Sequence, residues 1–129
     1  RTEDLPIGML VRGGCKRDPG DAVIAAYEAP YPSLGAKAGA RAFPLLIPTA
    51  PDSPGAAAGA RVLQALRSDT RPRLMLWADS DPVIPLATGQ RFAATLGGEI
   101  DHVIADAGHF LQEDAGPLIG ETIAGWLSA

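Results

Sequence analysis

The chain has 129 residues, 47% of them hydrophobic, a formal net charge of −4 and a single cysteine, Cys15. This length allows one domain with a core of ordinary size, and the hydrophobic content excludes a disordered chain. The lack of a basic run argues against nucleic acid or an anionic membrane as partner, and no apolar run is long enough to span a bilayer. One cysteine excludes an internal disulfide and a cysteine-based zinc site. It is compatible with the reducing cytoplasm, where we expect the protein.

The first part of the chain predicts helices separated by proline-rich turns. Residues 5–11 should form one or two helical turns that break at the glycine pair 13–14. Asp18 is a suitable N-cap and Pro19 a suitable first helical residue, so a second helix should begin there. Pro30 should end it, because proline cannot continue a helix.

Two more helices are expected before the character of the chain changes. Residues 37–43 predict a short helix, and the Asp-Ser-Pro sequence at 52–54 should open a longer one that reaches Leu66. No convincing strand precedes residue 70. We therefore expect residues 1–70 to form a helical lobe.

The remaining residues, 71–129, have the spacing of an α/β unit. The apolar run at 74–77 is typical of a strand that is buried on both faces of a parallel sheet, and its Trp77 is expected to be a core aromatic. The order strand, helix, strand predicts two adjacent parallel strands, with the helical lobe packed over their ends. The expected elements are a strand at 74–77, a helix at 86–96, a strand at 100–105 and a helix that ends the chain.

Two polar residues, Asp81 and His109, follow the ends of these strands, and Gly108 should permit the sharp turn before His109. Sites in open α/β sheets form beyond the carboxyl ends of the strands, so the two turns should lie side by side. A carboxylate beside a histidine can fix the tautomer of the imidazole and stabilise its protonated form. Alternatively, Asp79, Asp81 and Asp106 only cap helices or tighten turns. We favour the acid–base pair, because both residues occur at matched strand ends.

Four stretches of the sequence resemble a known family. Trp-Ala-Asp-Ser-Asp-Pro-Val at 77–83 and Asp-Ala-Gly-His-Phe at 106–110 resemble the C-terminal part of α/β-hydrolases. Ala-Tyr-Glu-Ala-Pro-Tyr-Pro at 26–32 and Lys-Ala-Gly-Ala-Arg-Ala-Phe-Pro at 37–44 resemble the cap domain of haloalkane dehalogenases. The resemblance implies an α/β fold, namely the C-terminal portion of an α/β-hydrolase with two parallel strands, their helices and part of a helical cap. Residues 1–70 would form the cap and its connection, and residues 71–129 the core segment.

The resemblance also implies roles for individual residues. In this fold the catalytic residues follow the order nucleophile, acid, histidine. Asp81 matches the acid and His109 the histidine, with Asp79 as the alternative acid. The implied reaction is hydrolytic cleavage of a carbon–halogen bond through an aspartyl ester, with a small apolar halogenated substrate, water, and no metal or organic cofactor. The implied substrate-binding wall comprises Phe43, Pro44, Ile47, Val83, Ile84 and Phe110. Phe43 and Ile47 could instead pack the cap on the core, and Phe110 could be ordinary core.

The nucleophile of this family does not occur in the sequence, which contains neither Gly-x-Asp-x-Gly nor Gly-x-Ser-x-Gly. The resemblance therefore implies a partner, an N-terminal half of the same enzyme that carries the aspartate. Two alternatives stay open. An esterase, lactonase or epoxide hydrolase would keep the fold and change the substrate. A non-catalytic fragment or interaction module would instead use the unpaired edge of the short sheet.

Overall fold

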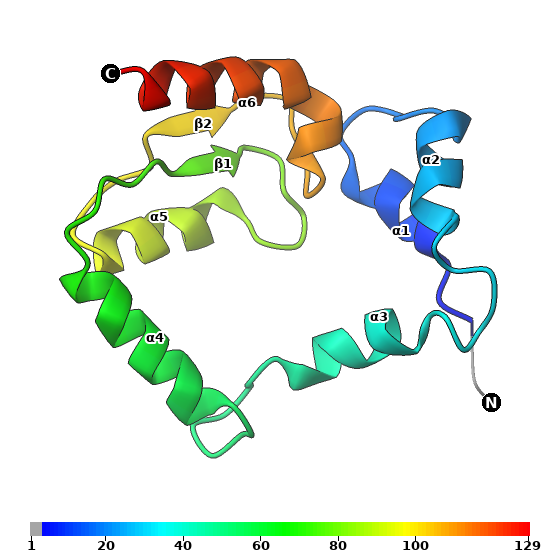
Figure 1. Cartoon of the computed structure of the whole chain (residues 1–129), viewed down its shortest axis with the longest axis horizontal. Coiled ribbons are helices and arrows are strands. Elements are labelled where there is room, and N and C mark those ends of the chain that lie inside the picture. The colour runs from blue at the N-terminus through cyan, green and yellow to red at the C-terminus, as the bar shows by residue number, and fades with distance from the viewer. Residues whose placement is uncertain (1–3) are drawn as a thin grey trace.

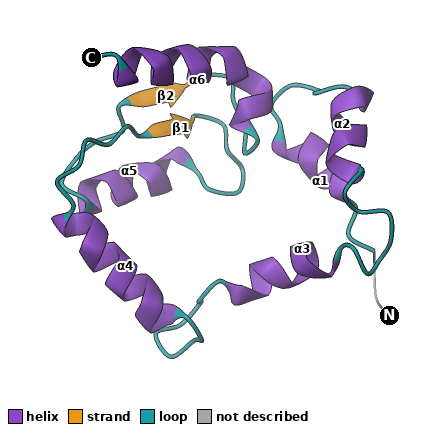
Figure 2. Cartoon of the chain, in the orientation of Figure 1, coloured by secondary structure: helices purple, strands orange, loops and turns teal. Residues whose placement is uncertain are grey.

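The computed structural model describes residues 4–129, which form helices around a two-stranded sheet (Figure 2). In Figure 1 the chain follows an open ring, and the first and last helices approach each other on one side. None of the helices in this described part combines the length and apolar character needed to cross a membrane. The elements are α1 (Ile7–Gly14), α2 (Asp21–Glu28), α3 (Ala38–Ala42), the 3₁₀ helix η1 (Phe43–Leu46), α4 (Ala56–Ser68), β1 (Leu76–Ala78), α5 (Leu86–Thr95), β2 (His102–Ile104) and α6 (Leu111–Leu127).

The two strands are adjacent and parallel, as the sequence predicted. Their register pairs Trp77 of β1 with Val103 of β2. Both strands are shorter than the expected 74–77 and 100–105. At the start of β1, the side chain of Asp101 takes the place of a backbone partner, because its Oδ2 accepts the N–H of Met75 at 2.7 Å.

The sheet lies between two helices, with α6 on one face and α5 on the other (Figure 1). The buried core is small and lies on the α6 side, where Ala78, Ile104 and Ala107 pack together. On the other side α5 approaches β1 so closely that a Cβ at Gly89 would overlap the ring of Trp77. The expectation of strands buried on both faces is only partly correct, because Val103 in β2 is 48% exposed.

The first two helices differ from their predicted bounds. α1 continues through Gly14 instead of breaking at the glycine pair. α2 begins at Asp21, and the residue at its N-cap position is Gly20, whose positive φ of 85° suits glycine. Asp18 is therefore not the N-cap. Its carboxylate accepts the N–H of Gly20 and pairs with Arg12 of α1, so it fixes the loop between the helices instead.

The helices α3, η1 and α4 form the outer arc of the ring (Figure 1). The prediction that the whole helical lobe packs over the strand ends is wrong for this arc. Two hydrogen bonds join α4 to the α/β part, and both lie at its C-terminal end: Arg67 donates to the carbonyl of Thr95, and Arg73 donates to the carbonyl of Leu66. α4 also starts later than predicted, after Gly55, which has a φ of 87°.

Candidate active site

Asp81 and His109 are in direct contact, as the sequence predicted. His109 Nδ1 lies 3.0 Å from Oδ2 and 3.2 Å from Oδ1 of Asp81. Oδ1 of Asp81 also accepts the backbone N–H groups of Val83 and Ile84, at 2.7 and 2.9 Å. Asp81 therefore closes its own turn and at the same time holds the imidazole.

The two turns meet because the backbone after β1 is bonded to the backbone after β2. Ser80 donates its N–H to the carbonyl of Ala107 at 3.1 Å. Asp79 accepts the N–H of Asp106 through Oδ2 at 3.2 Å. Asp79 thus bonds to the neighbouring turn, and Asp81 is the aspartate that contacts His109. Asp106 itself has a φ of 54°, so the sharp bend is made by an aspartate, a residue type that tolerates this region.

Gly108 serves a different purpose from the one predicted. A Cβ at this position would overlap the carbonyl oxygen of Gly14, so glycine permits a close approach of two backbones. That carbonyl oxygen accepts the N–H of His109 at 2.6 Å and the N–H of Phe110 at 3.3 Å. The end of α1 therefore lies directly against the backbone of the histidine.

The electrostatic surroundings keep the carboxyl of Asp81 ionised. Its partial burial opposes ionisation, but hydrogen bonds from His109 and from the N–H groups of Ile84 and Val83 outweigh it, so the pKa of Asp81 lies below its ordinary value. An ionised carboxylate can only accept hydrogen bonds, so the hydrogen in this contact belongs to Nδ1 of His109. Nε2 is then left with a lone pair that can accept a proton. The side chain of His109 is 33% exposed, whereas that of Asp81 is 10% exposed.

A small hollow of about 210 Å³ opens beside this pair. The hollow is mostly apolar. Ile84 is the one residue of the six in the predicted substrate wall that lines it. The other predicted wall residues in the α/β part lie elsewhere: Val83 is exposed, and the ring of Phe110 packs edge-on against Tyr27 and His109. The hollow is lined by Leu76, Trp77, Ala78, Asp81, Ile84, His109 and Leu111.

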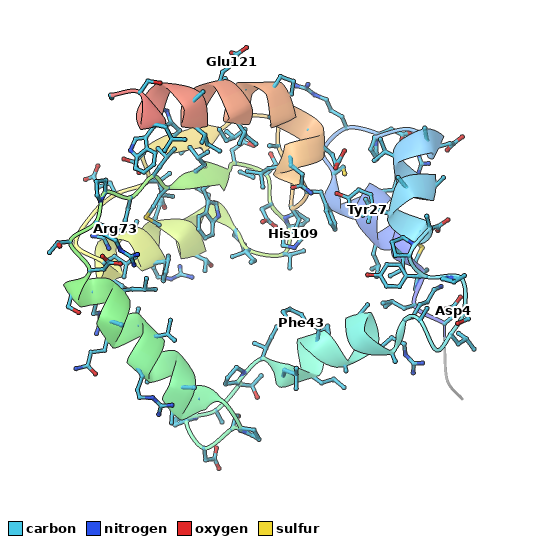
Figure 3. All side chains as sticks on the ribbon, viewed as in Figure 1. Asp4, Tyr27, Phe43, Arg73, His109 and Glu121 are labelled. Atoms are coloured by element: carbon cyan, nitrogen blue, oxygen red, sulfur yellow. The ribbon has the colours of Figure 1, made fainter. Side chains whose placement is uncertain are left out.

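The remaining wall candidates, Phe43, Pro44 and Ile47, belong to the outer arc. Figure 3 shows Phe43 and His109 on opposite sides of the open ring. Phe43 is 70% exposed and Ile47 is 61% exposed. The structure therefore does not bring these three residues to the hollow, and it does not pack them as core either.

Sequence reasoning missed two residues at this site. Trp77 is more than a core aromatic, because it lines the hollow and its indole Nε1 donates to the carbonyl of Ile84 at 3.0 Å. Asp114, in the first turn of α6, accepts the backbone N–H of Gly108 at 2.8 Å. An acidic residue in the first turn of a helix is too common for its position alone to indicate this contact. Within residues 4–129, no three His, Cys, Asp or Glu side chains gather as a metal site would require.

Comparison with protein families places this geometry in a known context. Residues 22–116 match the family described as alpha/beta hydrolase fold. The chain is similar to a haloalkane dehalogenase of Mycobacterium marinum, with 39% identity over 123 residues, 95% of this chain and 41% of the relative. A haloalkane dehalogenase of Psychrobacter cryohalolentis is 36% identical over 129 residues and covers 95% of this chain, which spans 42% of that relative.

The fold is also similar to solved structures of haloalkane dehalogenases. A DbeA-M1 loop variant of haloalkane dehalogenase from Bradyrhizobium elkanii superposes with a TM-score of 0.80 at 27% identity, over 92% of this chain and 40% of its own. The tetrameric haloalkane dehalogenase DpaA from Paraglaciecola agarilytica NO2 superposes with a TM-score of 0.79 at 27% identity, over 95% of this chain and 41% of its own. The chain thus spans about two fifths of the length of the relatives it matches.

Proposed function

The chain belongs to the alpha/beta hydrolase fold family, and from this premise we propose that it supplies the acid and the histidine of a haloalkane dehalogenase-type hydrolase. The observation that carries the proposal is the hydrogen bond between His109 Nδ1 and Asp81 Oδ2, at the edge of a mostly apolar hollow. The similarity to enzymes named haloalkane dehalogenases supports the choice of reaction.

His109 acts in the second half of this reaction as the general base. Asp81 holds the hydrogen on Nδ1, so Nε2 can take a proton from water. The resulting hydroxide attacks the carbonyl carbon of an alkyl ester. The ester then releases an alcohol, the nucleophilic carboxylate is restored, and Asp81 stabilises the protonated imidazole until the proton is lost to solvent.

The first half of the reaction needs an aspartate that this sequence does not contain on a suitable turn. We propose that a segment preceding residue 1 in the complete enzyme supplies it. Its carboxylate oxygen bonds to the carbon of a small apolar haloalkane, and the halide leaves with the electron pair of the broken bond. The coverage of about two fifths of each relative supports such a segment.

The apolar surface of the chain supports the same arrangement. Large hydrophobic side chains on several elements are exposed, whereas soluble monomers seldom leave large contiguous apolar patches uncovered. We propose that residues 1–70 form part of a cap, that residues 71–129 complete the core beside the preceding segment, and that Ile84 and the wall candidates on the outer arc face the substrate in that assembly. The exposed side chains include Phe43, Leu45, Leu46, Ile47, Val62, Val83 and Val103.

The cytoplasm is the proposed location of the protein, and a single cysteine is compatible with that reducing compartment.

The test is halide release from a short bromoalkane. We expect no turnover from the 129-residue chain alone, since loss of the nucleophile from a catalytic set typically lowers kcat by about a millionfold. Joined to a segment that carries the nucleophilic aspartate, the chain should show steady turnover. In that joined form, His109→Phe should release one equivalent of halide in a burst and then stop, because only ester hydrolysis needs the general base.

Three results would contradict the proposal. Turnover by the chain alone that disappears in His109→Ala would require a nucleophile within these 129 residues. Continued turnover by the joined form of His109→Phe would remove the water-activating role of the histidine. Hydrolysis of carboxylic esters or epoxides in place of halide release would assign the site to a different hydrolase of the same fold.

A further inference from the structure

The carboxylate of Asp114 accepts three backbone hydrogen bonds from two separate parts of the chain. Oδ2 accepts the N–H groups of Lys16 and Gly108, each at 2.8 Å, and Oδ1 accepts the N–H of Arg17 at 2.9 Å. Lys16 and Arg17 lie in the loop between α1 and α2, and Gly108 immediately precedes His109. One side chain therefore joins the α1–α2 loop to the turn that carries the histidine.

A helix-start aspartate ordinarily needs no such partners, because its charge alone is favourable beside the N-terminus of a helix. Asp114 differs in geometry. The helix is interrupted directly after it, where Ala115 has non-helical angles of φ −141° and ψ 26°, and Pro117 has no N–H to donate to the carbonyl of Glu113. The first turn of α6 is thus set apart from the rest of the helix, and the side chain of Asp114 bonds outside its own helix.

The end of α1, which leads into the loop held by Asp114, also contacts the histidine directly. Gly14, two residues before Lys16, accepts the N–H of His109 at 2.6 Å through its carbonyl oxygen. The backbone approach at this point is close, since a Cβ at Gly108 would overlap that oxygen. The backbone on the N-terminal side of His109 is therefore held by Asp114. The N–H of His109 itself is held by the last residue of α1, two residues before the loop segment that Asp114 fixes.

The surroundings of Asp114 favour the ionised form of its carboxyl group. Partial burial opposes its ionisation, but the N–H groups of Lys16, Gly108 and Arg17 outweigh that cost and hold the pKa of Asp114 below its ordinary value. Hydrogen bonds from backbone N–H groups to a charged acceptor are stronger than neutral ones. Two further residues of the same turn, Gln112 and Glu113, form hydrogen bonds with the hydroxyl of Tyr27 in α2. These bonds attach α2 to the first turn of α6 without the participation of Asp114.

We propose that Asp114 is a positioning residue for His109. Its carboxylate joins the α1–α2 loop to Gly108 and thereby holds the backbone of His109 where the imidazole meets Asp81. The effect of this role on catalysis rests on the proposed function. The connection that Asp114 makes between the α1–α2 loop and Gly108 does not depend on it. The group that Asp114 recognises is a set of backbone N–H donors in the chain itself, so no ligand is involved.

The test of the link is amide hydrogen exchange of the chain, followed residue by residue by NMR. In Asp114→Ala the amides of Lys16, Arg17 and Gly108 should exchange about tenfold faster or more, because they lose their acceptor. The decisive amide is that of His109, which does not bond to Asp114 and should nevertheless also exchange faster. Glu113→Gln is the matched control, since it removes an equal charge from the same helical turn and should leave His109 unchanged.

A second variant keeps the test valid if Asp114→Ala does not fold. Asp114→Asn retains one oxygen, which can still accept from Lys16 and Gly108 but presents an amide donor to Arg17. Arg17 should then exchange fast while Gly108 and His109 stay largely protected. Unchanged exchange at His109 in folded Asp114→Ala, equal acceleration in Glu113→Gln, or no change at Arg17 in Asp114→Asn would each overturn the proposal.

The activity measurement separates this inference from the proposed function. In the joined form, Asp114→Ala should keep the single burst of halide and lose most of its steady turnover, and KM should fall together with kcat, because only the hydrolysis of the ester is slowed. A merely unfolded fraction would lower the burst and the turnover equally, which would count against the positioning role. If the wild-type joined form releases no halide at all, the proposed function fails, while the exchange data still decide the role of Asp114.

Discussion

Both carboxylate oxygens of Asp81 lie within hydrogen-bond distance of Nδ1 of His109, and one of them, Oδ1, also holds the turn that presents the acid. Oδ2 lies 3.0 Å from Nδ1 of His109, and Oδ1 accepts the N–H groups of Val83 and Ile84. The hydrogen bonds within the turn therefore orient the carboxylate of Asp81 independently of its contact with His109. Substitutions at this carboxylate should affect the tautomer of His109 more than the fold.

The first prediction concerns Asp81→Asn. With its oxygen on Val83 and Ile84, the new amide would donate toward Nδ1 of His109, so the hydrogen would move to Nε2 and the base would be lost. We expect steady halide release by the joined form to fall by about 10³- to 10⁴-fold, with the first burst retained. Asp79→Asn is the control and should keep most of the turnover, because Asp79 bonds to the backbone of Asp106. Loss of turnover in Asp79→Asn alone would reverse the assignment.

The second prediction concerns Gly108→Ala. The added Cβ would overlap the carbonyl oxygen of Gly14, so the histidine turn and the end of α1 must separate. We expect a loss of about 1–3 kcal/mol in the free energy of unfolding, measured by urea denaturation. Gly120→Ala, at an open position within α6, should instead stabilise the chain by about 0.5–1 kcal/mol. Equal effects of the two changes would contradict the close backbone approach.

The third prediction compares the two tryptophans. Trp77→Phe removes the indole N–H that donates to the carbonyl of Ile84, and it leaves space against Gly89. The expected loss in the free energy of unfolding is about 1–2 kcal/mol. Trp126 in α6 is 38% exposed, and Trp126→Phe should change the free energy of unfolding by less than about 0.5 kcal/mol. Thermal unfolding followed by circular dichroism measures both, and a larger loss for Trp126→Phe would contradict the packing described.

The fourth prediction concerns pH. The pKa of Asp114 is lowered in the folded chain, so its contribution is fully present above the unfolded value of about 3.9 and is lost as the pH falls through the folded value. The stability difference between the wild type and Asp114→Asn should therefore be constant near neutrality and shrink in acid. Urea titrations of both proteins between about pH 6 and pH 3 measure it. A difference that grows in acid would contradict the lowered pKa.

Much of the α/β part was predictable from local pattern. The apolar run before Asp79 and the later one before Asp106 predicted two parallel strands, and the structure confirms their pairing. The α/β-hydrolase fold inferred from the resemblance is confirmed by the family match over residues 22–116. Parallel strands place their carboxyl ends at one edge, so strand order predicted that the two turns lie side by side. The choice of Asp81 over Asp79 as the partner of His109 came from the resemblance, and the structure shows the contact.

Helix starts were less predictable. Asp18 and the Asp-Ser-Pro sequence at 52–54 have the composition of helix caps, yet the helices start after Gly20 and Gly55. Asp18 instead pairs with Arg12, nine residues before the start of α2. A side-chain oxygen that can cap a helix can equally bond to a neighbouring loop, and sequence does not show which donor lies nearer.

The sequence by itself determined the strand order and the placing of Asp81 and His109 after adjacent strands, because these depend on residue type and periodicity along one segment, while the family followed from the resemblance of four stretches to known members. Only the tertiary structure decided the role of Asp114 and the separation of Phe43 from the hollow beside His109. The hydrogen bonds of Asp114 to Lys16 and Arg17 cross 98 and 97 positions of the chain. Which backbone donors meet a carboxylate over such separations depends on how loops approach in space, and no local periodicity encodes that approach.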